Sequence, residues 1–132
     1  MQDILTPISP GELIDKLTIL EIKAERIQDA AKLANVRHEL HLLRETWRKS
    51  GHDQRVIQKQ WDELRRINAE LWDIEDLIRE EERAQRFEAE FIRLARAVYV
   101  TNDERARVKR EINTQLGSRI VEEKSYSDYR AS

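Results

Sequence analysis

The stretch Ser50-Gly51-His52-Asp53 divides this 132-residue chain into two long segments with the apolar spacing of helices. Gly51 can take the left-handed conformation that ends a helix, and Asp53 can cap the helix that follows. Upstream, Ser9-Pro10-Gly11-Glu12 has the pattern of a helix start with a capping box. On both sides of Gly51 apolar residues recur every three or four positions. They are Leu13, Leu17, Leu20, Ala24, Ile27, Leu33, Val36, Leu40, Leu43 and Trp47 before the turn, and Ile57, Trp61, Leu64, Ile67, Leu71, Ile74 and Ile78 after it.

This pattern predicts an all-α fold, in which a long antiparallel, coiled-coil-like helical hairpin turns at Gly51. A turn centred near residue 52 would pair Leu17 with Phe87 and Leu13 with Phe91. The charged residues support this register, because more of the facing positions carry opposite charges than like charges. The apolar phase slips at residues 29–32, so the first helix is either bent or broken there. A second capping box at 101–104 predicts a short third helix ending near Gly117, which completes a domain of residues 1–117. Residues 118–132 are expected to form a partly ordered tail.

Helices of this length carry apolar residues outside the seam, so a lone hairpin would leave them uncovered. The additional apolar residues are Ile14, Ile19, Ile22, Leu42, Trp72, Leu77 and Ile92. The simplest cover is a second copy, which predicts a homodimer forming a four-helix bundle.

Composition excludes several classes of protein. The chain has no Cys, 38% charged residues and a net charge of −2, with 3 Gly and 2 Pro. These values argue against a disulfide scaffold, a β-sandwich or barrel, and a dedicated nucleic-acid binder. No apolar run approaches the roughly 20 residues of a membrane span, and no signal peptide is evident. We therefore expect a cytoplasmic protein without a nucleic-acid or membrane partner.

Basic residues concentrate late in the chain, where residues 93–110 hold six bases against two acids. The predicted register would bring Arg93 and Arg96 beside the start of the first helix, where free N–H groups attract anions. With Tyr99 and Lys109, they would form a phosphate- or carboxylate-binding pocket. The alternative is that these bases only form ion pairs, for which the acids available are Glu12, Asp15, Glu122 and Glu123.

Acidic residues offer a second candidate site. Glu70, Asp73 and Asp76 are spaced by three, so neighbouring carboxylates share a helix face and could bind Mg²⁺. All-helical nucleoside-triphosphate pyrophosphohydrolases use carboxylates at such spacings on two neighbouring helices. In a chain this rich in Glu such spacings also arise by chance, and a solvated helix face is the simpler interpretation.

Several segments together resemble a family of small all-helical bacterial proteins, a domain of unknown function. The segments are SPGELIDKLTILEIK (9–23), LWDIED (71–76), FIRLARAVY (91–99), ND (102–103), RA (105–106) and EEKSY (122–126). The genes of that family are often found near those for glycosyltransferases and surface-polysaccharide assembly. The resemblance implies a bacterial surface-glycan context, and it adds Glu12, Asp15, Lys16, Asn102 and Asp103 to the polar end that holds Arg93, Arg96, Tyr99 and Lys109.

These observations favour a non-enzymatic accessory or interaction protein without a cofactor. Its polar end would bind a phosphorylated sugar or nucleotide sugar, or dock a glycosyltransferase or other pathway enzyme. The rival hypothesis is a small Mg²⁺-dependent hydrolase of nucleotides or sugar phosphates that uses Glu70, Asp73 and Asp76.

Overall fold

The computed structural model describes residues 1–130, and within them the chain is entirely helical, as predicted, with no strand. The helices are α1 (Pro10–Arg26), α2 (Ala30–Lys49), the 3-10 helix η1 (Gln54–Ile57), α3 (Gln58–Arg83) and α4 (Ala89–Gln115). No helix in this part of the chain is long and apolar enough to cross a membrane.

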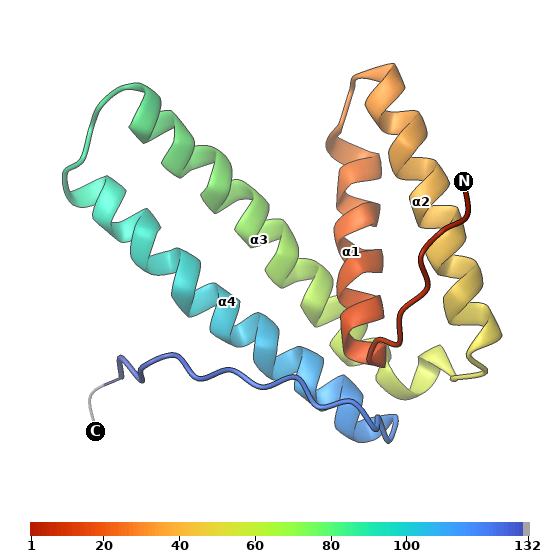
Figure 1. Ribbon diagram of the computed structural model, residues 1–132. Helices are drawn as coiled ribbons and strands as arrows, with labels where there is room; N and C mark the ends of the chain where they lie inside the picture. Colours follow the sequence, from red (N-terminus) through yellow and green to blue (C-terminus); the bar gives the residue numbers. More distant parts are fainter. Residues whose placement is uncertain (131–132) are drawn as a thin grey trace.

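The helices form two hairpins instead of one. α1 packs against α2, and α3 packs against α4 over its whole length (Figure 1). α1 also contacts α3 and α4, whereas the backbone of α2 approaches no helix except α1. The two hairpins meet where η1 joins them, and they diverge from that joint like the arms of a V (Figure 1).

The predicted register is therefore wrong. Thr18, one residue after Leu17, accepts a hydrogen bond from Asn68. Asn68 lies fifteen residues before the end of α3 at Arg83, which is about 22 Å along a helix. Phe87 lies beyond that end, in the connection between α3 and α4, and its ring packs edge-on against Phe91. Leu17 and Phe87 are consequently far apart.

Two interruptions of the predicted long helices account for the difference. Residues 27–29 interrupt the first predicted helix, and Asp29 caps α2 by accepting from the Lys32 amide at 2.9 Å, so the broken alternative is correct. The second break, at residues 84–88, was not predicted, and Gln85 takes a left-handed conformation there with φ 56°. The short third helix from Thr101 is also wrong, because α4 runs through this buried residue without interruption.

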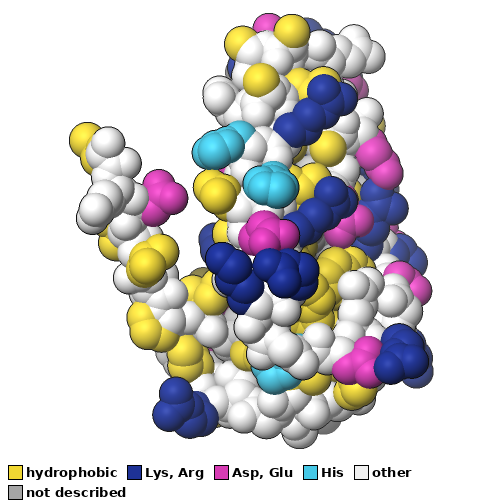
Figure 2. Space-filling view, turned by 90° about the vertical axis from the view of Figure 1, so that its right-hand side faces the viewer, with side chains coloured by type: hydrophobic (Ala, Val, Ile, Leu, Met, Phe, Trp, Pro, Cys, Tyr) yellow, Lys and Arg dark blue, Asp and Glu magenta, His cyan; other side chains and the backbone are white. Residues whose placement is uncertain are grey.

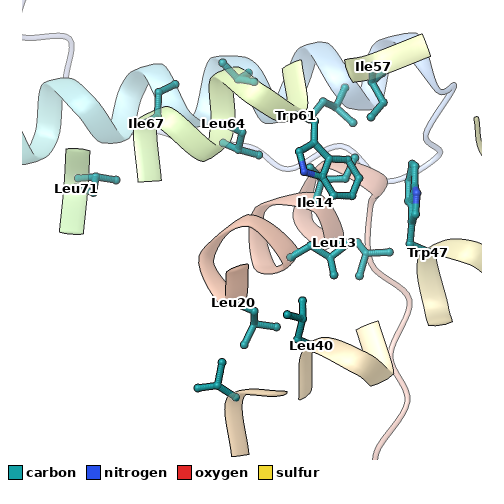
Figure 3. Close-up of a cluster of buried hydrophobic side chains, with 14 residues drawn as sticks. Leu13, Ile14, Leu20, Leu40, Trp47, Ile57, Trp61, Leu64, Ile67 and Leu71 are labelled. Carbon is teal, nitrogen blue, oxygen red and sulfur yellow. The ribbon is translucent and has the colours of Figure 1, made fainter. Parts of the chain in front are cut away.

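The apolar core lies at the joint of the two hairpins (Figure 3). Leu13, Leu17 and Leu20 of α1 pack there with residues of the other three helices. Trp47 at the end of α2 meets Trp61 of α3 edge-on, with 5.6 Å between ring centroids. The remaining core residues include Ile14, Val36, Leu40, Ile57, Leu64, Ile67, Leu71, Val108 and Ile112. The core therefore fixes the start of α1 against the start of α3 and the end of α4.

The tail after α4 contains no helix or strand as far as residue 130, and the last two residues of the predicted tail, 131–132, lie outside the described part. It turns at Gly117 and runs back beside α4 (Figure 1). Tyr129 packs against Tyr99 of α4, with 4.9 Å between ring centroids. A hydrogen bond to Asp103 raises the pKa of the Tyr129 hydroxyl. The tail is thus held along one side of the helix.

Candidate functional site

The start of α1 makes an unusually close approach to α4. Ser9 caps the helix by accepting from the Glu12 amide at 3.2 Å, and the Gly11 amide donates to Oδ1 of Asn113 at 2.7 Å. A Cβ on Gly11 would lie 2.5 Å from the carbonyl oxygen of Lys109, closer than real contacts allow. A glycine is therefore needed at position 11 for α1 to reach α4.

One turn further along α1, the carboxylate of Asp15 is only 1% exposed and is fully hydrogen-bonded. Arg105 of α4 binds both of its oxygens, with Nε donating to Oδ1 at 2.8 Å. Asn68 of α3 donates to the same Oδ1 at 2.9 Å and to the Thr18 hydroxyl at 3.0 Å. The hydrogen bond to Asp15 raises the pKa of Arg105. Because buried charges are costly without partners, this network fixes three helices relative to one another.

Lys109 lies beside this network and joins α1 to the tail. Its Nζ is 2.7 Å from Oε2 of Glu12, 3.1 Å from Oε2 of Glu122 and 3.9 Å from Oδ2 of Asp15. Burial disfavours the charged form of Lys109, but hydrogen bonds to Glu12 and Glu122 outweigh burial and raise the pKa of the ammonium group. Lys16 adds a longer ion pair to Glu12 at 3.7 Å.

A pocket of about 330 Å³ opens between α4 and the tail, next to Lys109. Four basic residues and two acids line it, together with amides, hydroxyls and a small apolar wall. These residues are Glu12, Asn102, Arg105, Ala106, Lys109, Arg110, Asn113, Thr114, Ser118, Ile120, Val121, Glu122 and Lys124. The excess of positive charge and the many hydrogen-bonding groups suit a small polar anion.

Charged side chains also cover the face of the molecule that α2 forms. On this face, Lys and Arg side chains lie among acidic, histidine and apolar ones (Figure 2). Such intermixed charge is typical of a solvated surface.

The structure brings together part of the predicted polar end. Glu12, Asp15, Lys16, Asn102 and Lys109 lie around the joint of α1 and α4. The ion pairs from Lys109 to Glu12, Asp15 and Glu122 were the ones foreseen in the alternative interpretation of this region.

Three predicted residues lie elsewhere on α4. Arg93 pairs with Glu90 at 2.5 Å on the exposed surface, and Tyr99 packs against the tail. Arg96 is exposed and lies one turn further along α4 than Arg93. Because α1 starts beside Asn113, Arg93 lies about 30 Å along α4 from that contact. The expectation that Arg93 and Arg96 flank the start of α1 is therefore wrong, since it depended on the wrong register.

Three important residues of the site, Arg105, Asn113 and Asn68, were not predicted to belong to it. Arg105, Lys109 and Asn113 are spaced by four, so they share one face of α4. That spacing was available as a signal. Asn68 comes from another helix, and no spacing in the sequence could have related it to Asp15.

The carboxylates of the alternative metal site are engaged with arginines. Glu70 pairs with Arg66 and Asp73 with Arg26, each at 2.7 Å. Asp76 is exposed on the next turn of α3. Within residues 1–130 no group of three or more His, Asp or Glu side chains is placed to hold a metal ion.

A family of unknown function (DUF6165) matches residues 4–131 of the chain. No curated protein matches the chain. No solved structure matches it either.

Proposed function

We propose that this chain, which belongs to the DUF6165 family, is a non-enzymatic binding protein whose pocket takes a phosphorylated sugar or a nucleotide sugar. The observation that carries the proposal is the pocket of about 330 Å³ between α4 and the tail. A volume of this size accommodates a small ligand.

The charges of the pocket support a phosphorylated ligand. Arg105 and Lys109 are already paired with carboxylates of the chain. Arg110 and Lys124 line the same pocket and form no ion pair with any side chain of residues 1–130. Their charges are therefore available to a phosphate group, which both residue types bind readily.

Glu122 adds a second indication of an anion site. Its carboxylate lies 3.1 Å from Nζ of Lys109 at the edge of the pocket. A carboxylate oxygen and a phosphate oxygen make the same kind of hydrogen bond to an ammonium group. The tail thus already places one carboxylate against Lys109 of the pocket, and a ligand phosphate would bind beside this carboxylate or displace it.

The polar lining would recognise the rest of the ligand. Asn102 and Thr114 on α4 and Ser118 in the tail carry amide and hydroxyl groups that can bond to sugar hydroxyls. Ile120 and Val121 provide an apolar wall against which a sugar ring can pack.

The wider context of the proposal rests on the sequence: its resemblance to the family for the glycan pathway, its composition for the cytoplasm, and its additional apolar residues for the dimer. We place the protein in bacterial surface-glycan biosynthesis, in the cytoplasm, as an accessory protein that forms a homodimer and docks a glycosyltransferase or another pathway enzyme. A pull-down from the native organism with the tagged chain, followed by mass spectrometry, tests the docking part.

The ligand itself is tested by thermal unfolding with glucose 1-phosphate, UDP-glucose, inorganic phosphate and unphosphorylated glucose. A ligand at one hundred times its Kd stabilises the fold by about 2.7 kcal/mol, so the melting temperature rises measurably. The phosphorylated compounds should raise it and glucose should not. Arg110→Ala and Lys124→Ala should abolish the rise, whereas Arg93→Ala, at an exposed pair on the same helix, should keep it.

Two results would contradict the binding proposal. One is an absence of any shift with all four compounds, and the other is an equal loss in Arg93→Ala. The rival hydrolase predicts a different pattern, in which Mg²⁺ alone raises the melting temperature and the double variant Asp73→Ala/Asp76→Ala no longer responds.

A further inference from the structure

The far end of the α3–α4 hairpin projects beyond the rest of the fold. Arg26, the last residue of α1, pairs with Asp73 at 2.7 Å, so α1 ends level with the middle of α3. Residues 74–98, which we call the tip, extend about 15 Å further as two helices and their connection. Figure 1 shows no other helix beside the tip.

The tip exposes large apolar side chains that a solvated helix pair does not need. Leu77 is 44% exposed, Phe87 48% and Ile92 55%. Phe91 packs against Phe87 and is itself only half-buried. Ile78 and Val98 are also half-buried. Several exposed apolar residues at the end of a projecting element indicate an interaction surface.

The charges of the tip identify the partner that fits it. Its α3 part, residues 74–83, carries five acids against two bases, and its α4 part, residues 89–98, carries two arginines against one acid. A two-fold axis beside the tip can set the acidic helix of one copy against the basic helix of the other. Such self-complementarity is what an isologous contact requires.

We propose that the tip is a dimerisation surface whose occupant is the tip of a second copy of this chain. The two pairs of helices then form a short four-helix bundle, which covers the apolar side chains of both copies. This assignment rests on the homodimer proposed above and is independent of the pocket, which lies at the other end of α4. The dimer leaves both pockets open to solvent.

Light scattering after size exclusion tests the assignment with the full chain, in a dilution series that starts at about 100 µM and gives the Kd of the dimer. The wild-type mass should be twice the 15.8 kDa of one chain. Ile92→Glu and Leu77→Glu should each weaken the dimer at least tenfold, which corresponds to about 1.4 kcal/mol. Both side chains are exposed in the monomer, so circular dichroism should show an unchanged helix content.

Matched variants test whether the tip, and no other exposed apolar position, forms the dimer contact. Leu42→Glu introduces the same charge on α2, at a side chain that is 40% exposed, and it should leave the dimer intact. Arg96→Glu should also weaken the dimer, because it reverses the charge of the basic helix. Lys124→Ala should change ligand binding but not mass, so failure of the pocket and failure of the tip are distinguishable.

The assignment is overturned by a wild-type chain that is monomeric at the highest concentration of the dilution series. It is equally overturned by a wild-type dimer that Ile92→Glu and Leu77→Glu leave unaffected, or that Leu42→Glu disrupts as strongly.

Discussion

Gly11→Ala should destabilise the protein, although alanine is the better helix former. In an ordinary helix this change would stabilise the fold by about 0.5–1 kcal/mol. Here the new Cβ would lie 2.5 Å from the Lys109 carbonyl oxygen and 2.9 Å from Oδ1 of Asn113. Overpacking of this kind costs about 1–3 kcal/mol, and loss of the buried bond from the Gly11 amide to Asn113 costs about 1–3 kcal/mol more.

The net expectation is a loss of about 3 kcal/mol in the free energy of unfolding, measured by urea denaturation followed by circular dichroism. For a chain of this size the melting temperature should fall by roughly 10 °C. Gly51→Ala provides the control, because Gly51 has φ 77° and a Cβ there meets nothing within 4 Å. Its cost should be only about 1–2 kcal/mol, from the left-handed backbone alone.

The relative stability of the two variants tests the close approach of α1 to α4. If Gly11→Ala is as stable as the wild type, or loses less than Gly51→Ala, the close approach of α1 to α4 is wrong. The positions of Glu12 and Asp15 against α4 would then also be wrong, because both follow Gly11 on the same helix.

Three further predictions concern the ion pairs. Asp15→Asn should lower the free energy of unfolding by about 3 kcal/mol, because it leaves the largely buried Arg105 without a charged partner; urea denaturation measures this, and a loss below about 1 kcal/mol would argue against the network. The raised pKa of Lys109 means that its ion pairs contribute fully to the free energy of unfolding below about pH 10, and contribute less as the pH rises through the folded-state pKa. Lys109→Met should remove this decline, and an identical pH profile in the variant would contradict the prediction. Arg93→Ala, measured on the monomer, should leave the free energy of unfolding unchanged within error, since its pair with Glu90 is exposed, and a clear loss by the same assay would show an unrecognised contact.

Local signals in the sequence predicted the ends of helices well where side chains cap them. Ser9 caps α1, Gly51 takes the left-handed conformation and Asp53 caps η1, as expected. The connection between α3 and α4 was not predicted, because it contains no Gly or Pro and Gln85 takes the left-handed conformation instead. A polar run was its only sign. The capping box at Thr101 failed because this residue packs against the rest of the fold, and burial outweighs a local capping preference.

The register could not be obtained from the charges. With 38% charged residues, many alignments of two helices place opposite charges together by chance. Each exposed pair contributes only about 0.2–1 kcal/mol, which is too little to select one alignment. Burial of Asp15 decides the true arrangement, and its partners Asn68 and Arg105 come from two different helices. Such a contact among three helices depends on the tertiary fold, and no periodic pattern in the sequence indicates it.

The contact between the start of α1 and the end of α4 should form late in folding. Its bonds join residues 90 positions apart at Asp15 and Arg105 and 102 positions apart at Gly11 and Asn113. Contacts within each hairpin span far shorter loops and cost less entropy to form. We expect both hairpins to form early and their docking to limit the folding rate. Since the connection at Gly51 lies between the hairpins, fragments cut there should reassemble into the native fold when mixed.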